Sequence, residues 1–187
     1  RRRARSRCTD QDDRLVLLAH DSDAFTRWEA GQKLALSRLL AALRSGTLEL
    51  DEPFVDAMRS VLRHPQLDAA FKALVLTLPD ENLLAEHLAS VNPQRVHAVR
   101  EVMLAQLARE LRDDWAWAFD THQVKGAYSP DPQSAGQRAL ANLALCMLCL
   151  DASTTVDATW PGRAYQRVKD AGNMTERLGA LAALTES

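Results

Sequence analysis

The sequence predicts an all-α protein, an irregular α-α superhelix of about nine helices packed antiparallel. Apolar residues recur three or four positions apart in almost every segment, which is the spacing of one helix face. No segment shows the alternation of a half-buried strand, and glycine and proline number only 7 each in 187 residues. Short connections between successive helices imply antiparallel neighbours. Because no strict repeat period is visible, we expect a HEAT-like solenoid of irregular form.

The helix predicted over residues 21–46 has clear start and stop signals. Asp21 and Asp23 offer side-chain oxygens to the free backbone donors of a first turn, and Gly46 suits the left-handed end of a helix. A short helix beginning at Asp12 precedes it. The face predicted to point inward holds Phe25, Trp28, Ala35, Leu36, Leu39 and Leu43. The face predicted to be polar and outward holds Arg27, Glu29, Gln32, Lys33, Arg38 and Arg44.

Four further helices are expected in the middle of the chain. A proline opens the first, and His64 ends it because the residue before a proline is pushed out of the helical conformation. Asp68 and Asp80 begin the next two. Asn92 caps a helix that we expect to run unbroken to residue 119 and to be the longest in the chain. The residues predicted to point inward are Phe54, Met58, Val61, Leu62, Phe71, Leu74, Val75, Leu78, Leu83, Leu84, Leu88, Val96, Val99, Met103, Leu107, Leu111, Trp115 and Phe119.

Three helices are expected after the loop of residues 122–132. The first ends near Asp151, the second spans residues 161–169, and the third starts where Asn173 and Glu176 form a reciprocal capping pattern. The residues predicted to point inward are Ala139, Leu140, Leu143, Met147, Leu148, Tyr165, Val168, Leu178, Leu181 and Leu184.

The net charge of −2 conceals a basic first segment and an acidic body. Residues 1–7 hold five arginines, and the other 18 basic residues stand against 25 acidic ones, a balance of −7. A body of that sign does not attract phosphate backbones, so we expect no nucleic-acid partner. We predict that residues 1–10 are the end of an upstream domain or linker and that residues 11–187 form one helical domain.

The sequence favours a cytoplasmic protein without membrane contact. No apolar run approaches the ~20 residues that a membrane helix needs, and no apolar region follows the arginines as in a secretory signal. Cysteines are odd in number, and Cys146 and Cys149 lie within an apolar run. Both features indicate reduced thiols in a cytoplasmic setting.

No catalytic or metal-binding residue is predicted in this chain. A zinc peptidase helix would show His-Glu-x-x-His, whereas His87 and His97 have the wrong order and spacing and are interpreted as surface or packing residues. Cys146 and Cys149 have a redox spacing but apolar flanks, so we interpret them as buried core thiols. Trp115 continues an apolar stripe, and Trp117 is assigned to its rim rather than to a sugar site.

Three segments, taken in order, resemble the C-terminal helical domain of the bacterial aminopeptidase N family of zinc metallopeptidases. The first carries Asp23, Phe25, Arg27, Trp28, Glu29, Ala30 and Gln32. The second runs from Leu88 to Leu111 and includes Asn92-Pro93 and Val99-Arg100-Glu101. The third is Asn173-Met174-Thr175-Glu176 with Leu178-Gly179-Ala180-Leu181.

The resemblance implies a parent with a β-rich domain, a thermolysin-like catalytic domain, a β-sandwich and this α-domain, truncated here at its C-terminal end. Zinc and the catalytic residues would belong to the parent's catalytic domain, with no cofactor in this chain. Its partners would be the catalytic and β-sandwich domains of the same parent chain. Peptides would be the parent's substrates, and this domain would help to enclose the active-site chamber.

Six residues near the start of the predicted 21–46 helix are candidates for domain docking or a structural role: Asp23, Phe25, Arg27, Trp28, Glu29 and Gln32. We expect Arg27 or Glu29 to pair within the domain or with the catalytic neighbour. Two other functions remain open. One is a free-standing helical scaffold that binds a peptide or partner protein in a groove. The other is a nucleic-acid arm formed by residues 1–7, which the acidic body disfavours.

Overall fold

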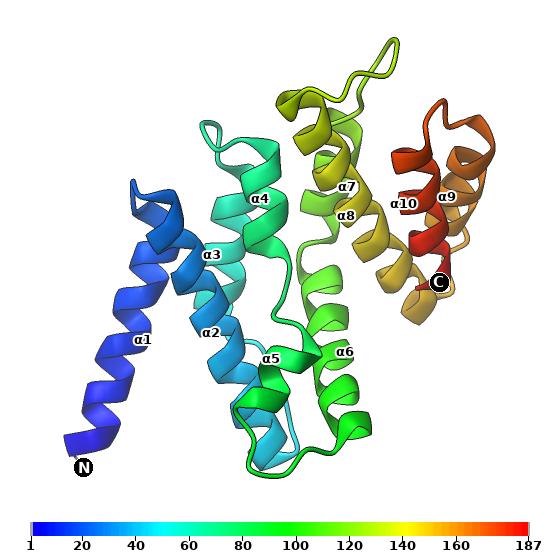
Figure 1. Ribbon diagram of the computed structural model, residues 1–187. Coiled ribbons are helices and arrows are strands. Elements are labelled where there is room, and N and C mark those ends of the chain that lie inside the picture. Colours follow the sequence, from blue (N-terminus) through cyan, green and yellow to red (C-terminus); the bar gives the residue numbers. More distant parts are fainter. Residues whose placement is uncertain (1, 187) are drawn as a thin grey trace. The chain divides into compact units, whose positions relative to one another are not determined.

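The computed structural model describes residues 2–186, and side chains for residues 10–186. Over this range the chain forms ten helices and no strand, so the predicted all-α class is confirmed (Figure 1). The structure does not describe the side chains of residues 1–9. The predicted basic arm of residues 1–7 and the Cys8 thiol therefore lie outside the described side chains. The helices are α1 (Arg2–His20), α2 (Ala24–Ser45), α3 (Glu52–Arg63), α4 (Ala69–Leu76), α5 (Glu81–Glu86), α6 (Pro93–Glu110), α7 (Arg112–Thr121), α8 (Pro132–Thr155), α9 (Thr159–Asp170) and α10 (Met174–Thr185).

Three helix predictions are wrong in their bounds, and one of them is the helix expected to end near Asp151, which continues to Thr155. Helix α1 begins at Arg2 rather than Asp12, because arginine and alanine favour a helix even without an apolar stripe. The single helix expected over residues 93–119 is two helices that meet at Leu111, where φ is −111° and ψ is 20°. The Leu107 carbonyl oxygen there accepts both the Leu111 N–H and the Trp115 indole N–H, each at 3.2 Å. As a result α8, with 24 residues, is the longest described helix.

The chain divides into two compact units. Unit 1 comprises Arg1–His64 and Leu74–Gln106, and unit 2 comprises Pro65–Ala73 and Leu107–Ser187. Each unit has its own buried apolar core.

In unit 1, α1 packs against both α2 and α3, and α2 also contacts α5 (Figure 1). Gly31 permits the approach to α1, because an added Cβ would stand 3.2 Å from Leu18 Cδ1. Gln106 fastens the α2–α3 loop by donating to the Leu48 carbonyl oxygen at 2.7 Å and accepting the Leu50 N–H at 2.8 Å. The predicted inward residues of α3 are confirmed as buried: Phe54, Met58, Val61 and Leu62.

In unit 2, α8 contacts α7, α9 and α10, and α9 packs against α10 (Figure 1). Gly136 of α8 lies against the first turn of α4, where an added Cβ would stand 2.7 Å from the Ala70 backbone nitrogen. Phe119 and Trp160 join α7 to α9 through an edge-to-face contact with ring centroids 5.7 Å apart. These contacts surround a core whose largest fully buried side chain is Trp115.

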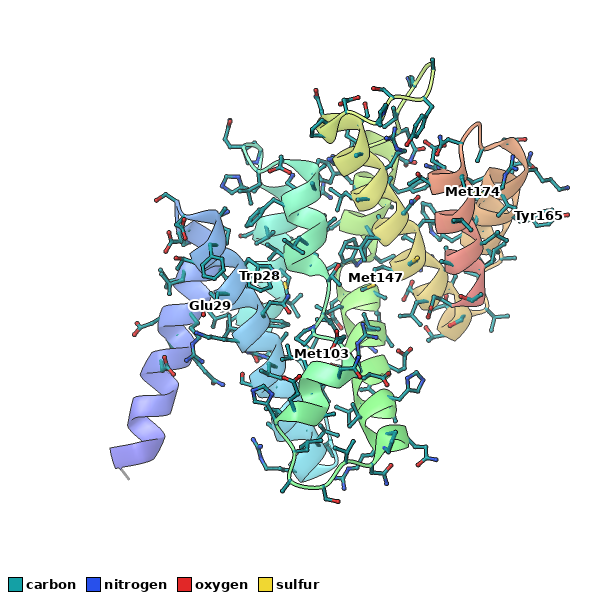
Figure 2. The ribbon with its side chains drawn as sticks, in the orientation of Figure 1. Trp28, Glu29, Met103, Met147, Tyr165 and Met174 are labelled. Carbon is teal, nitrogen blue, oxygen red and sulfur yellow. The ribbon has the colours of Figure 1, made fainter. Side chains whose placement is uncertain are left out.

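Some leucines predicted to be inward are exposed. Leu178 and Leu181 of α10 are 56% and 43% exposed, and Leu74 of α4 is 56% exposed. On α10 the buried face is formed instead by Ala180 and Ala183, since small side chains allow a close approach to α8. Tyr165, also predicted inward, is half exposed and projects outward from α9 (Figure 2).

None of the described helices combines the length and the apolar character needed to cross a bilayer.

Candidate functional site

Asp23 starts helix α2. Its backbone is extended, with φ −83° and ψ 119°, and its Oδ2 accepts the Thr26 N–H at 2.7 Å. The hydrogen bond with Thr26 lowers the pKa of the Asp23 carboxyl. The Asp23 N–H itself donates to Asp21 Oδ1 at 2.7 Å, so the turn between α1 and α2 is held by two aspartates.

Arg27 was predicted to be on the polar face, and this prediction is wrong, since the residue is only 4% exposed. Its Nε and Nη2 donate to the Asp21 carbonyl oxygen at 3.1 and 2.6 Å, while Nη1 is buried and has no partner among the described residues. The aliphatic stem of an arginine can pack with apolar neighbours while its head finds an acceptor. Arg27 therefore ties the first turns of α2 to the α1–α2 connection.

Phe25 and Trp28 form an aromatic pair at the surface of unit 1. Their ring centroids are 5.8 Å apart with the planes tilted by 43°, as expected for residues three apart on a helix. Phe25 is 65% exposed, so its predicted inward position is wrong. Trp28 and its neighbour Glu29 are labelled on α2 in Figure 2. Trp28 is only partly exposed, and aromatic side chains are enriched at protein–protein interfaces.

The other two candidates make contacts within unit 1. Glu29 pairs with Lys33 at 2.8 Å, and both side chains are about half exposed. Gln32 Nε2 donates to the Thr77 carbonyl oxygen at 2.9 Å and links α2 to the segment after α4. Arg27 and Glu29 thus both have partners inside the unit. A docking role for any of the six residues remains a prediction.

Cys149 is buried as predicted, whereas Cys146, also predicted to be buried, is only partly buried. Burial raises the pKa of Cys146 to about 11 and that of Cys149 to about 12, so both thiols stay protonated near neutral pH. His97 is exposed, and its Nδ1 lies 2.8 Å from Glu81 Oε1. The described residues bring together no three His, Cys, Asp or Glu side chains that could hold a metal ion.

Sequence reasoning missed three buried cations. Lys72 and Arg138 are 4% and 2% exposed, comparable to Arg27, and Arg138 borders a cavity in unit 2. A signal was present: Arg138 lies three residues before Ala141 and seven before Leu145, on the buried stripe of α8. A basic residue on an apolar stripe predicts a buried, specifically contacted side chain.

The fold defines a helical-repeat domain. Its candidate side chains cap a helix, as Asp23 does, pack between elements, as Arg27 does, or lie at the surface, as Phe25 does. A family model described as a domain of unknown function, DUF3458_C, with ARM repeats matches residues 11–187, and the chain belongs to this family. The match to helical repeats agrees with the predicted superhelical class.

Curated relatives confirm the resemblance to aminopeptidase N. The chain is 35% identical over 170 residues to "Aminopeptidase N" of Caulobacter vibrioides, covering 90% of this chain and 19% of the relative. It is 32% identical over 177 residues to "Aminopeptidase N" of Haemophilus influenzae, covering 92% and 20%. The chain therefore spans about one fifth of the length of these relatives.

A solved structure has the same fold. The crystal structure of Legionella pneumophila aminopeptidase A in complex with aspartic acid aligns with a TM-score of 0.79 at 24% identity. The alignment covers 94% of this chain and 21% of that one.

Proposed function

We propose that this chain is a non-catalytic helical domain of an aminopeptidase N-like zinc exopeptidase, which removes N-terminal amino acids from peptides. The domain would help to enclose the active-site chamber and restrict access to it. The observation that carries the proposal is the similarity to proteins called aminopeptidase N over about nine tenths of this chain but only a fifth of theirs. Zinc would be held by a catalytic domain elsewhere in the parent.

The Phe25 and Trp28 pair is the proposed contact with a neighbouring domain of the same parent chain. Aromatic side chains dominate the energy of many protein interfaces because they bury a large area with little conformational cost. Arg27 and Asp23 fix the helix turn that presents the pair, through their bonds to Asp21 O and Thr26 N. The pair would thus be held rigidly at the start of α2.

The first experiment compares substrates of different length with the full-length enzyme that contains this chain. Phe25→Glu places a charge in the proposed contact and loosens the chamber. We expect cleavage of a 20-residue peptide, relative to a short aminoacyl reporter, to rise by about tenfold, equivalent to ~1.4 kcal/mol. Val102→Glu is the matched control, since Val102 is also an exposed apolar residue of unit 1.

Two results would overturn parts of this proposal. If the isolated chain, supplied with zinc, released amino acids from the reporter, it would not be a non-catalytic domain. If Phe25→Glu and Val102→Glu changed the length preference equally, the docking role of the aromatic pair would be wrong.

A further inference from the structure

Arg138 of unit 2 is a buried cation with few partners. It is 2% exposed, and the one hydrogen bond that it makes to the described residues runs from Nη2 to the Ser129 carbonyl oxygen at 2.6 Å. Its Nε is enclosed and has no hydrogen-bond partner in the part of the chain that the structure describes. The guanidinium lies 4.7 Å from the Tyr128 ring centroid. Since a guanidinium carries five N–H donors, most of its hydrogen-bonding capacity is unused.

A cavity of about 410 Å³ adjoins this arginine. Its wall is formed by residues of the α7–α8 loop, by Arg138 itself, and by Gly172, Asn173 and Glu176 at the start of α10. The volume is within the range of small-molecule sites, about 300–1,000 Å³. The N-terminal end of the 12-residue helix α10 adds a partial positive charge to the same wall.

No acidic side chain of the described residues pairs with Arg138. Glu176 lines the cavity, but its Oε1 lies 3.8 Å from Arg167 Nη2. The buried carboxylate of the unit, Asp151, stands 3.4 Å from Arg112 Nε. A buried charge without a counter-charge is costly, so a ligand that supplies one gains binding energy at this position.

We propose that this cavity binds the carboxylate group of a small molecule or of a peptide terminus, with Arg138 as the principal donor. A planar carboxylate matches the parallel N–H donors of a guanidinium in geometry and charge. The Tyr128 ring lies against the guanidinium, with Arg138 Cζ 4.7 Å from the ring centroid. The negative charge of Glu176 repels a doubly charged phosphate more strongly than a carboxylate.

The experiment is calorimetric titration of the full chain with four probes: acetate, N-acetylalanine, the dipeptide Ala-Ala and alaninamide. We expect saturable binding of the carboxylate-bearing probes and none of alaninamide, which lacks the carboxylate. Tighter binding of Ala-Ala than of acetate would identify a peptide terminus as the source, and equal binding would identify a small acid. No saturable binding of any carboxylate, or equal binding of alaninamide, would overturn the proposal.

Variants test the role of Arg138. Arg138→Lys keeps the charge but removes the paired donors, and we expect affinity to fall about tenfold. Arg163→Lys is the control, because Arg163 is partly exposed and already paired with Asp120 at 2.7 Å. Glu176→Gln keeps Arg138 and removes a negative charge that repels the carboxylate of the ligand, so affinity should rise about threefold. This variant tests the site even if Arg138→Lys does not fold. Unchanged affinity in both Arg138→Lys and Glu176→Gln would overturn the assignment.

Discussion

The two units use the same two kinds of residue where helices meet, a buried arginine and a glycine, with different surroundings. In unit 1, Arg27 makes two bonds to the Asp21 carbonyl oxygen, and Gly31 faces the end of the Leu18 side chain. In unit 2, Arg138 makes one bond and borders a cavity, and Gly136 faces the backbone of Ala70.

This comparison distinguishes residues that only stabilise the fold from residues whose donors are free to bind a ligand. A side-chain end can move by a few tenths of an ångström, whereas backbone in a helix cannot, so Gly136 marks a rigid contact and Gly31 an adaptable one. An arginine with two bonds to one carbonyl stabilises a turn. An arginine with unused donors beside a cavity is instead a candidate for binding a ligand.

The largest expected effect is the loss of stability in Gly136→Ala. The new Cβ would stand 2.7 Å from the Ala70 nitrogen, so helices must separate. We expect a loss of about 2–3 kcal/mol in the free energy of unfolding, even though alanine favours a helix by ~1 kcal/mol. Gly31→Ala should change it by less than about 1 kcal/mol, because the strain at Leu18 is offset by that helix preference.

Urea unfolding followed by circular dichroism measures both variants. Gly162→Ala is the matched control, since an added Cβ there meets nothing within 4 Å and should stabilise α9 by roughly 0.5–1 kcal/mol. Equal losses in Gly31→Ala and Gly136→Ala would show that the two helix contacts are alike.

The second effect concerns the arginines themselves. Arg27→Met keeps a long side chain but removes two charge-assisted bonds to Asp21, and we expect a loss of about 2 kcal/mol. Arg138→Met removes one bond and also removes a poorly matched buried charge, so its effect should lie within about 1 kcal/mol of zero. The same urea experiment measures both. A larger loss at Arg138 would mean that unit 2 depends on this arginine for stability.

The bounds of α2 could be predicted because its signals are local. Asp23 and Gly46 act within one turn of the helix ends, and the structure places the cap and the left-handed residue at these positions. The break at Leu111 could not be predicted, since Leu107, Leu111 and Trp115 keep a spacing of four across it. Apolar spacing reports which side of a helix is inward but not whether the backbone bends.

Burial was predicted well where large apolar residues form the inward helix face, as on α3, and poorly where small or charged residues are buried instead. On α10 the buried residues are Ala180 and Ala183 and not the leucines. This outcome depends on how closely α8 approaches α10, which the sequence does not show. For Arg27 and Arg138 a local signal existed, because each lies three residues before a buried alanine, Ala30 or Ala141. The cavity beside Arg138 could not be predicted, since its walls come from residues up to 52 positions apart, from Val124 to Glu176.

The smallest expected effect is a difference between the two units in how one histidine of each contributes to stability as pH changes. In unit 1 the hydrogen bond with Glu81 raises the pKa of His97, so the stability from this pair is present below the unfolded-state pKa and is lost as pH rises through the folded-state pKa. In unit 2, burial lowers the pKa of His122. Its contribution therefore has the opposite sign: it is present above the unfolded-state pKa and is lost as pH falls through the folded-state pKa.

Nuclear magnetic resonance titration of the two imidazoles tests this pair directly. We expect the His97 midpoint above 6.5 and the His122 midpoint below it. Glu81→Gln should bring the His97 midpoint down towards 6.5, because the neutral amide no longer favours the imidazolium, and should leave His122 unchanged. Equal midpoints for His97 and His122 in the unmodified protein would contradict this prediction. They would mean that neither the Glu81 carboxylate nor the burial of His122 shifts the pKa of its imidazole.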